Sequence, residues 1–370
     1  MKPLSLYLHI PFCVKKCAYC DFPSHAGREQ DIPAYIEALK GEITESGRNY
    51  ADRRVETIFF GGGTPSILTG GQIKNLMDAV FSSFTVSPEA EISMEANPGT
   101  LTPEKLAAYR EAGINRLSIG VQAMNDRLLQ NIGRIHTRDE AAEAVRMAKE
   151  SGFENINVDL MYGLPGQRPA DFEDTLHQAL ILPVTHLSMY SLIVEEGTPL
   201  YARVEQGEEI PGDEETLIMQ HTAARIAAQH GLFRYEISNY ARPGFECRHN
   251  LVYWRRGDYL GLGCAAHSMA DGARFSNTAS LSGYLSGVRE TERQLLDDTD
   301  ALEETVMLSL RTTEGMDLSL YRALCADAFP KKERIISRLT AEGLACAANG
   351  RLALTERGMD VLNAVIEALV

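Results

Sequence analysis

The sequence predicts an α/β protein whose first half alternates parallel strands with helices. Three observations support this prediction. Short apolar runs recur between residues 1 and 195, amphipathic helical patterns separate them, and glycine and polar residues gather where the runs end. Mostly apolar strands indicate a parallel sheet covered by helices. With right-handed crossovers, that sheet forms either an open doubly wound layer or a partial barrel, with its sites at the carboxyl ends of the strands.

Six strand–helix units are expected in this region. The first strand contains Leu4, Leu6, Leu8 and Ile10 and ends at Pro11. The other predicted strands cover residues 55–60, 91–96, 116–121, 156–161 and 186–192. Helical spacing of apolar residues predicts helices near residues 31–43, 71–84, 103–112 and 138–150.

The second half of the chain is less regular. A helix is expected at residues 214–230, a strand at 235–238, and then a loop rich in arginine, glycine and aromatic residues. Further helical stretches at 318–324 and 334–344 precede a short strand at 352–354. We therefore expect a strand–helix core over residues 1–195, an extension over 196–300, and a small helical, winged-helix-like domain over 301–370.

Composition limits the partners and the compartment. The formal net charge of −15 argues against binding to nucleic acid. No segment reads as a signal peptide, and none approaches the roughly 20 apolar residues of a membrane span. Cys247, Cys264, Cys325 and Cys346 are scattered and form no disulfide framework. We expect a cytoplasmic protein without an integral membrane segment.

Three cysteines follow the first strand in C-x3-C-x2-C spacing. Cys13, Cys17 and Cys20 complete neither a tetrahedral zinc site nor a four-cysteine cluster. On a [4Fe-4S] cluster, they leave one iron open for a small molecule. The alternatives are three unrelated buried thiols or a zinc knuckle completed by His9 or His25.

Candidate ligand-binding residues follow the next two strands. The segment Gly61–Gly62–Gly63–Thr64 lets the backbone approach a ligand, with amides that suit a carboxylate. A plain turn is the alternative reading. Glu95 ends the third strand, and its two oxygens suit a ribose diol, unless a neighbouring amide satisfies them.

Polar side chains also stand near the ends of later strands. Gln122, Arg134 and Asp159 suit a carboxylate, a purine or a second ligand. Arg134 and Asp159 alternatively belong to a salt-bridge set inside the barrel. Tyr7, on the first strand, either packs its ring against a cofactor near the cysteines or belongs to the core.

The cysteine spacing, directly after a first strand, resembles the cluster loop of radical S-adenosylmethionine (SAM) enzymes. This resemblance implies a radical-SAM partial (β/α)6 barrel, a [4Fe-4S] cluster held by the three cysteines, and SAM bound to the open iron. Gly62, Gly63 and Thr64 match the segment that contacts the methionyl end of SAM, and Glu95 is implied to hold the same molecule.

Within that superfamily, the chain resembles oxygen-independent coproporphyrinogen III dehydrogenases and their HemW-type relatives over essentially its whole length. The residues that carry this resemblance run from the first strand to the fifth. They are Tyr7, the cysteine loop with Asp21 and Phe22 behind it, Gly62, Gly63, Thr64, Glu95, Gln122, Arg134 and Asp159. By this resemblance, Gln122, Arg134 and Asp159 match further SAM contacts, either to the same SAM or to a second one.

Two features favour the HemW-type branch. The dehydrogenases have a fourth cysteine two residues after the third, where this chain has Phe22, and an N-terminal extension before the cluster strand. Residues 249–254 read H-N-x2-Y-W, which is a mark of HemW-type proteins. That branch resembles haem chaperones, which bind haem and deliver it to haem-requiring respiratory proteins.

The H-N-x2-Y-W stretch is also the candidate haem site. His249 suits the iron, its aromatic neighbours suit stacking on a porphyrin, and Arg255 and Arg256 suit the propionates. The alternative is a structural loop in which His249 is hydrogen-bonded locally. Cys247, Cys264 and His267 are rival iron ligands, and they stand in the same part of the chain.

We therefore expect a haem chaperone that holds a [4Fe-4S] cluster, SAM and haem. The rival is a dehydrogenase that removes hydrogen and CO2 from two substrate propionates, with electrons from a flavodoxin- or ferredoxin-like donor. A third reading is a radical SAM enzyme acting on an unrelated substrate without tight haem binding. The sequence leaves open whether the protein is an enzyme, whether SAM is cleaved, which protein accepts haem, and whether two copies form a homodimer.

Overall fold

The computed structural model describes the backbone of residues 1–370 and every side chain except that of Asp327. Six parallel strands form the centre of one curved sheet and pair in chain order. They are β1 (Lys2–Ile10), β4 (Arg53–Gly62), β5 (Thr85–Ala96), β6 (Arg116–Gln122), β7 (Asn155–Tyr162) and β8 (His186–Ser191). Within the described residues, the two edges of the sheet do not pair with each other. The predicted partial (β/α)6 barrel is confirmed.

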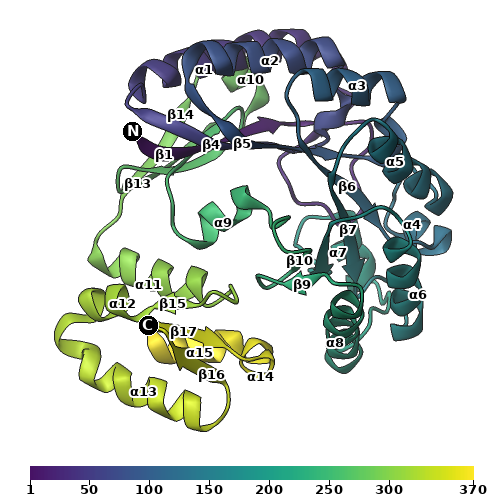
Figure 1. Ribbon diagram of the computed structural model, residues 1–370. Helices are drawn as coiled ribbons and strands as arrows, with labels where there is room; N and C mark the ends of the chain where they lie inside the picture. The colour runs from purple at the N-terminus through teal and green to yellow at the C-terminus, as the bar shows by residue number, and fades with distance from the viewer.

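Helices cover the outer, convex side of this sheet (Figure 1). They are α1 (Ile32–Asn49), α2 (Gly70–Ser83), α3 (Pro103–Glu111), α5 (Arg138–Glu150), α6 (Pro169–Leu180) and α8 (Asp213–Gln229). Capping boxes begin two of them, because Thr69 and Thr137 each exchange hydrogen bonds with the residue three positions on. The short helices α4 (Asp126–Asn131) and α7 (Pro199–Glu205) were not predicted, since so few residues show no clear helical period.

The sheet continues beyond both ends of the barrel. Next to β1 lies the parallel strand β11 (Tyr259–Leu262), followed by the antiparallel strands β12 (His267–Ala270), β13 (Ala273–Asn277) and β14 (Glu290–Leu295). The helices of this extension are α9 (Arg248–Trp254) and α10 (Leu281–Leu285). Two short strands, β2 (Phe12–Cys13) and β3 (His25–Ala26), bracket the cysteine loop.

The strand predicted at residues 235–238 is wrong. Those residues form the turn between β9 (Phe233–Arg234) and β10 (Asn239–Ala241), which pair beside β8. The Glu236 side chain accepts hydrogen bonds from the backbone N–H of Ser238, at 3.1 Å, and from the amide of Asn239. Such local side-chain bonds compete with a strand ladder and favour a turn.

A separate small unit ends the chain. It consists of α11 (Asp298–Ser309), β15 (Met316–Asp317), α12 (Leu318–Cys325), α13 (Phe329–Ala341), β16 (Ala345–Ala348), β17 (Arg351–Leu354), α14 (Glu356–Asp360) and α15 (Leu362–Leu369). Its sheet order, β15-β17-β16, and its helix–strand–helix–helix–hairpin sequence confirm the winged-helix-like expectation. It has its own hydrophobic cluster, so we propose residues 301–370 as a distinct domain. No helix in the described part of the chain has the length and apolarity to span a membrane.

Candidate active site in the barrel cavity

The carboxyl ends of the parallel strands open into a cavity of about 530 Å³. Twelve of the residues that the sequence analysis placed in the site line this cavity, whereas Gly61, Arg255 and Arg256 do not. The twelve lining residues are Tyr7, Cys13, Cys17, Cys20, Gly62, Gly63, Thr64, Glu95, Gln122, Arg134, Asp159 and His249. The structure therefore brings together residues that the chain spreads over more than 240 positions.

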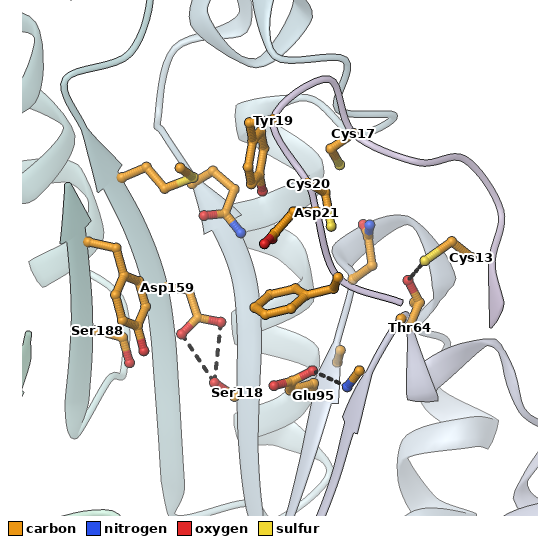
Figure 2. Close-up of a pocket in the computed structure, with 18 of the residues that line it drawn as sticks. Cys13, Cys17, Tyr19, Cys20, Asp21, Thr64, Glu95, Ser118, Asp159 and Ser188 are labelled. Atoms are coloured by element: carbon orange, nitrogen blue, oxygen red, sulfur yellow. Dashed lines mark hydrogen bonds between the residues drawn. The ribbon is translucent and has the colours of Figure 1, made fainter. Parts of the chain in front are cut away.

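The three cysteines lie on one loop above Glu95, Ser118 and Asp159 (Figure 2). Thr64 Oγ1 donates to Cys13 Sγ over 3.4 Å, and Arg134 Nη1 donates to Cys17 Sγ over 3.5 Å. Donors at these distances suit thiolate sulfur. The three thiols and their donors thus fit an iron–sulfur cluster held from one side.

The zinc-knuckle alternative finds no preformed site. Among the described residues, no three side chains of His, Cys, Asp or Glu stand close enough to hold a single metal ion. Both ring nitrogens of His9 are already hydrogen-bonded, Nδ1 to the Tyr7 hydroxyl at 3.1 Å and Nε2 to the Pro23 carbonyl at 2.9 Å. His9 therefore joins the first strand to the end of the cysteine loop.

Two backbone amides of the glycine segment, which were expected to bind a ligand carboxylate, instead form hydrogen bonds within the fold. The N–H groups of Gly63 and Thr64 donate to the carbonyls of Ile10 and Phe12, at 2.9 and 2.8 Å, and are not free for a ligand carboxylate. Gly62 has a φ of +108°, and a Cβ there would lie 2.4 Å from the His9 ring. The segment needs glycine because it packs directly against the strand that enters the cysteine loop.

Two half-buried carboxyl groups face the middle of the cavity (Figure 2). Glu95 accepts one hydrogen bond, from the N–H of Gly62 at 3.2 Å, and burial together with the nearby Asp159 raises its pKa to about 8. Asp159 accepts from Ser118 at 3.2 Å and from Asn157 at 2.7 Å, and burial raises its pKa. Glu95 is thus largely protonated at neutral pH, with hydrogen-bonding capacity to spare.

The side chains of Gln122 and Arg134 both lie close to Gly120, near the end of β6. Gln122 has a φ of +69°, a left-handed backbone conformation that is uncommon for residues other than glycine. Arg134 donates to the Gly120 carbonyl as well as to Cys17. Among the described residues, neither Arg134 nor Asp159 forms an ion pair, so the internal salt-bridge alternative is not realised.

His249 stands in the aromatic wall of the cavity and is 1% exposed. Its Nδ1 is 2.7 Å from Thr57 Oγ1 and its Nε2 is 2.8 Å from the Tyr253 hydroxyl. The ring stacks on Phe59, with centroids 5.2 Å apart, and Phe59 in turn stacks on Tyr7. Burial lowers the pKa of His249 to about 3, so the ring is neutral. The rivals Cys247, Cys264 and His267 do not line the cavity.

The two arginines after the H-N-x2-Y-W stretch are already paired. Arg255 contacts Glu314 at 2.9 Å, and Arg256 contacts Glu304 at 2.7 Å. Both glutamates belong to the C-terminal unit, so these arginines hold that unit against α9. In this structure, carboxylates of the chain itself therefore occupy the two groups that were expected to bind haem propionates, and neither arginine lines the cavity.

Sequence analysis missed several lining residues on the inner face of the barrel. They are Arg116 and Ser118 on β6 and Ser188 and Tyr190 on β8; Tyr19, on the cysteine loop, also lines the cavity. The available signal was alternation, since every second residue of β6 and β8 is polar or glycine in an otherwise apolar strand. Once the strands are known to line a cavity, this two-residue alternation identifies the side chains that point into it.

The fold and the cysteine-lined cavity define a radical SAM protein. The model of the Radical SAM superfamily matches residues 7–179, and that of the HemN C-terminal domain matches residues 296–361. The solved structure of coproporphyrinogen III oxidase (HemN) from Escherichia coli, described as a radical SAM enzyme, has a TM-score of 0.86 at 28% identity. That match covers 100% of this chain and 90% of HemN.

Curated relatives narrow the class to one family. The heme chaperone HemW of Escherichia coli (strain K12) is 37% identical over 99% of this chain and 98% of its own length. That of Bacillus subtilis (strain 168) is 36% identical over 99% of each. This chain belongs to the HemW family.

Proposed function

We propose that this protein is a haem chaperone that holds a [4Fe-4S] cluster and SAM in the barrel cavity, binds haem, and passes it to haem-requiring respiratory proteins. The observation that carries the proposal is the meeting of all predicted cluster and SAM residues in one cavity beside α9. Relatives that match nearly the whole chain are named heme chaperones, which supports the same reading.

In this proposal Cys13, Cys17 and Cys20 hold the cluster. When bound, the cluster supplies an iron with an open position and one-electron chemistry. Thr64 and Arg134 stabilise the sulfur ligands through the donors described above. The chain orients these cysteines on a loop whose two ends, β2 and β3, pair with each other.

SAM occupies the cavity beneath the cysteine loop. Glu95 accepts the ribose hydroxyls, since its carboxyl group has only one amide partner. Gln122, Arg134 and Asp159 make further contacts, to this SAM or to a second one. Tyr7 closes the wall beside them.

Haem enters through the mouth of the cavity, where apolar side chains are exposed, and extends toward His249. Phe22 is 62% exposed and Ile193 is 68% exposed, and both line the cavity. Exposed apolar residues at a mouth suit the face of a porphyrin. We include His249 in the haem site because its neutral ring lines the cavity; for it to bind iron through Nε2, the Tyr253 hydroxyl must turn away.

A haem titration of the purified protein tests this proposal. We expect a saturable Soret shift, followed by transfer of haem to an apo-form of a respiratory haem protein. His249→Ala changes the Soret position if His249 binds the iron, whereas Tyr253→Phe keeps the position and tightens binding. A wild-type protein without any saturable shift rejects the chaperone and favours an unrelated radical SAM substrate.

The second candidate function is coproporphyrinogen III dehydrogenation, which the similarity to HemN favours. Phe22, in place of a fourth cysteine, counts against it. The reconstituted protein is incubated anaerobically with coproporphyrinogen III, SAM and a reductant, beside a known dehydrogenase. Formation of protoporphyrinogen over several turnovers establishes the enzyme and calls for a flavodoxin- or ferredoxin-like donor.

We also propose a reducing, cytoplasmic setting for the protein. All seven cysteines are free thiols. Three of them are the cluster ligands, and such a cluster needs protection from oxidation.

A further inference from the structure

Arg116 occupies the floor of the cavity. It is the first residue of β6 and shares the inward face of that strand with Ser118 and Gln122. At roughly 3.3 Å per residue, it lies about 20 Å along the strand from Gln122, where the cysteine loop packs. Its side chain is 2% exposed and yet lines the cavity.

The guanidinium of Arg116 has no partner in the described part of the protein. No hydrogen bond or ion pair to a described residue engages it, and its Nε is buried and unsatisfied. Arginine keeps its charge in proteins, and a buried charge without a partner is costly. The floor therefore contains a cation that no described carboxylate contacts directly, although Glu91 and Asp159 lie near enough to raise its pKa.

The acids nearest to Arg116 are occupied by other donors. Glu91 accepts from the backbone N–H groups of Arg248 at 3.0 Å and His249 at 3.1 Å. Asp159 accepts from Ser118 and Asn157, as described above. These carboxylates attract Arg116 across a distance, but neither one binds it.

The histidines around Arg116 are satisfied as well. His186 holds Asn157 through Nδ1 at 2.6 Å and the Tyr235 hydroxyl through Nε2 at 2.8 Å. Burial and the charge of Arg116 lower the pKa of His186 well below its usual range and keep that ring neutral. The donors left over at the floor are thus those of the guanidinium.

We propose that Arg116 is an anion site that binds a carboxylate of the ligand at the base of the cavity. A guanidinium presents paired N–H groups that match a carboxylate in a bidentate contact. The identity of the ligand rests on the proposed function. We assign the carboxylate to a haem propionate, because the methionyl carboxylate of SAM lies at the cysteine loop in that arrangement.

The test compares haem with haem dimethyl ester, in which both propionates lack their charge. In the wild-type protein, the ester should bind roughly ten- to hundredfold more weakly in a Soret titration, as expected for the loss of a buried, charged hydrogen bond. Arg116→Gln should bind haem and ester equally, at the level of the ester. Arg116→Lys should restore part of the difference in affinity between haem and its ester, since lysine keeps the positive charge but lacks the paired N–H groups of the guanidinium.

Lys15, at the mouth of the same cavity, provides the matched control. Lys15→Gln should keep the full preference for haem over its ester. Equal binding of haem and ester by the wild-type protein, a measurement that needs no variant to fold, overturns the assignment to haem. A preference that survives in Arg116→Gln and disappears in Lys15→Gln also overturns it.

A second arm distinguishes the source of the carboxylate. Equilibrium dialysis of the reconstituted protein compares SAM with decarboxylated SAM. If the protein prefers SAM to decarboxylated SAM and Arg116→Gln loses this preference, Arg116 is an anion site and the carboxylate that it binds belongs to SAM. If Arg116→Gln changes neither the preference for haem over its ester nor the preference for SAM over decarboxylated SAM, Arg116 is not an anion site. A wild-type protein that binds no haem rejects the proposed function, while the SAM arm still tests Arg116.

Discussion

The cysteine side and the α9 side of the cavity differ in how completely their polar groups are satisfied. On the cysteine side, Cys13 and Cys17 have only long contacts of 3.4 and 3.5 Å, and Glu95 has one amide partner. On the α9 side, both nitrogens of His249 have partners within 2.8 Å. On the cysteine side, polar groups remain available to bind ligands. On the α9 side, the nitrogens of His249 are hydrogen-bonded to other residues of the fold.

The α9 side also supports the C-terminal unit. In Figure 1, α9 lies on the concave side of the sheet, between the barrel and that unit. Glu304 of α11 receives Arg256 at 2.7 Å and Arg274 at 3.0 Å. The H-N-x2-Y-W stretch therefore joins two parts of the protein in addition to lining the cavity.

The largest effect is expected from the cysteine side. Cys17→Ser should abolish cluster assembly, because it removes one of three ligands on a single loop. The measurement is iron and sulfide content after anaerobic reconstitution. Cys346→Ser, an exposed cysteine of the C-terminal unit, is the control and should retain a full cluster. Full iron content in Cys17→Ser would falsify the assignment of the cluster.

Glu95 should make SAM binding depend on pH. Its pKa is about 8 without ligand, and only the ionised form accepts both ribose hydroxyls. Affinity should therefore rise with pH, by at most about tenfold per unit below that pKa, and level off above it.

Equilibrium dialysis from acidic to alkaline pH measures this slope. Glu95→Gln should lose the part of the slope that belongs to this carboxyl group and bind SAM roughly tenfold more weakly at high pH. Identical slopes in the two proteins contradict the role of Glu95. The comparison cancels the titration of the amino group of SAM, which both proteins share.

A smaller effect is expected from His249, on stability. His249→Ala should lower the free energy of unfolding by about 2–4 kcal/mol, because it removes two buried hydrogen bonds and a stacked ring. The measurement is urea unfolding followed by circular dichroism. An unchanged midpoint shows that α9 does not depend on this ring.

The same residue predicts a stability change with pH. The folded pKa is about 3, well below the value of about 6.5 expected in the unfolded chain. Below the unfolded value, the unfolded chain binds a proton that the folded one does not, so stability falls as pH drops from about 6.5 toward 3. His249→Ala should show a shallower fall over that window.

The smallest effect is expected from the exposed pair between Arg255 and Glu314. Arg255→Gln should cost no more than about 1 kcal/mol, because both side chains are largely solvated. Urea unfolding measures the cost, and haem titration should show an unchanged affinity. A large loss of haem affinity would return Arg255 to the haem site.

The positions of the parallel strands and their carboxyl ends could be predicted because their signals are local, although β5 begins at Thr85, six residues before the predicted start. Apolar runs mark β4 to β8, and three cysteines in eight residues mark a cluster loop. The turn at residues 235–238 could not be predicted, because its cause is the side chain of Glu236 reaching back to nearby backbone and amide groups.

By itself, the sequence determined the α/β class, the cysteine loop and which residues end each strand, since residue type and spacing set these. Only the tertiary structure decided which polar groups remain free. Long-range contacts use up the amides of Gly63 and Thr64 and both nitrogens of His249, while none reaches the guanidinium of Arg116. Hydrogen-bond partners of this kind come from distant parts of the chain, so residue spacing does not reveal them.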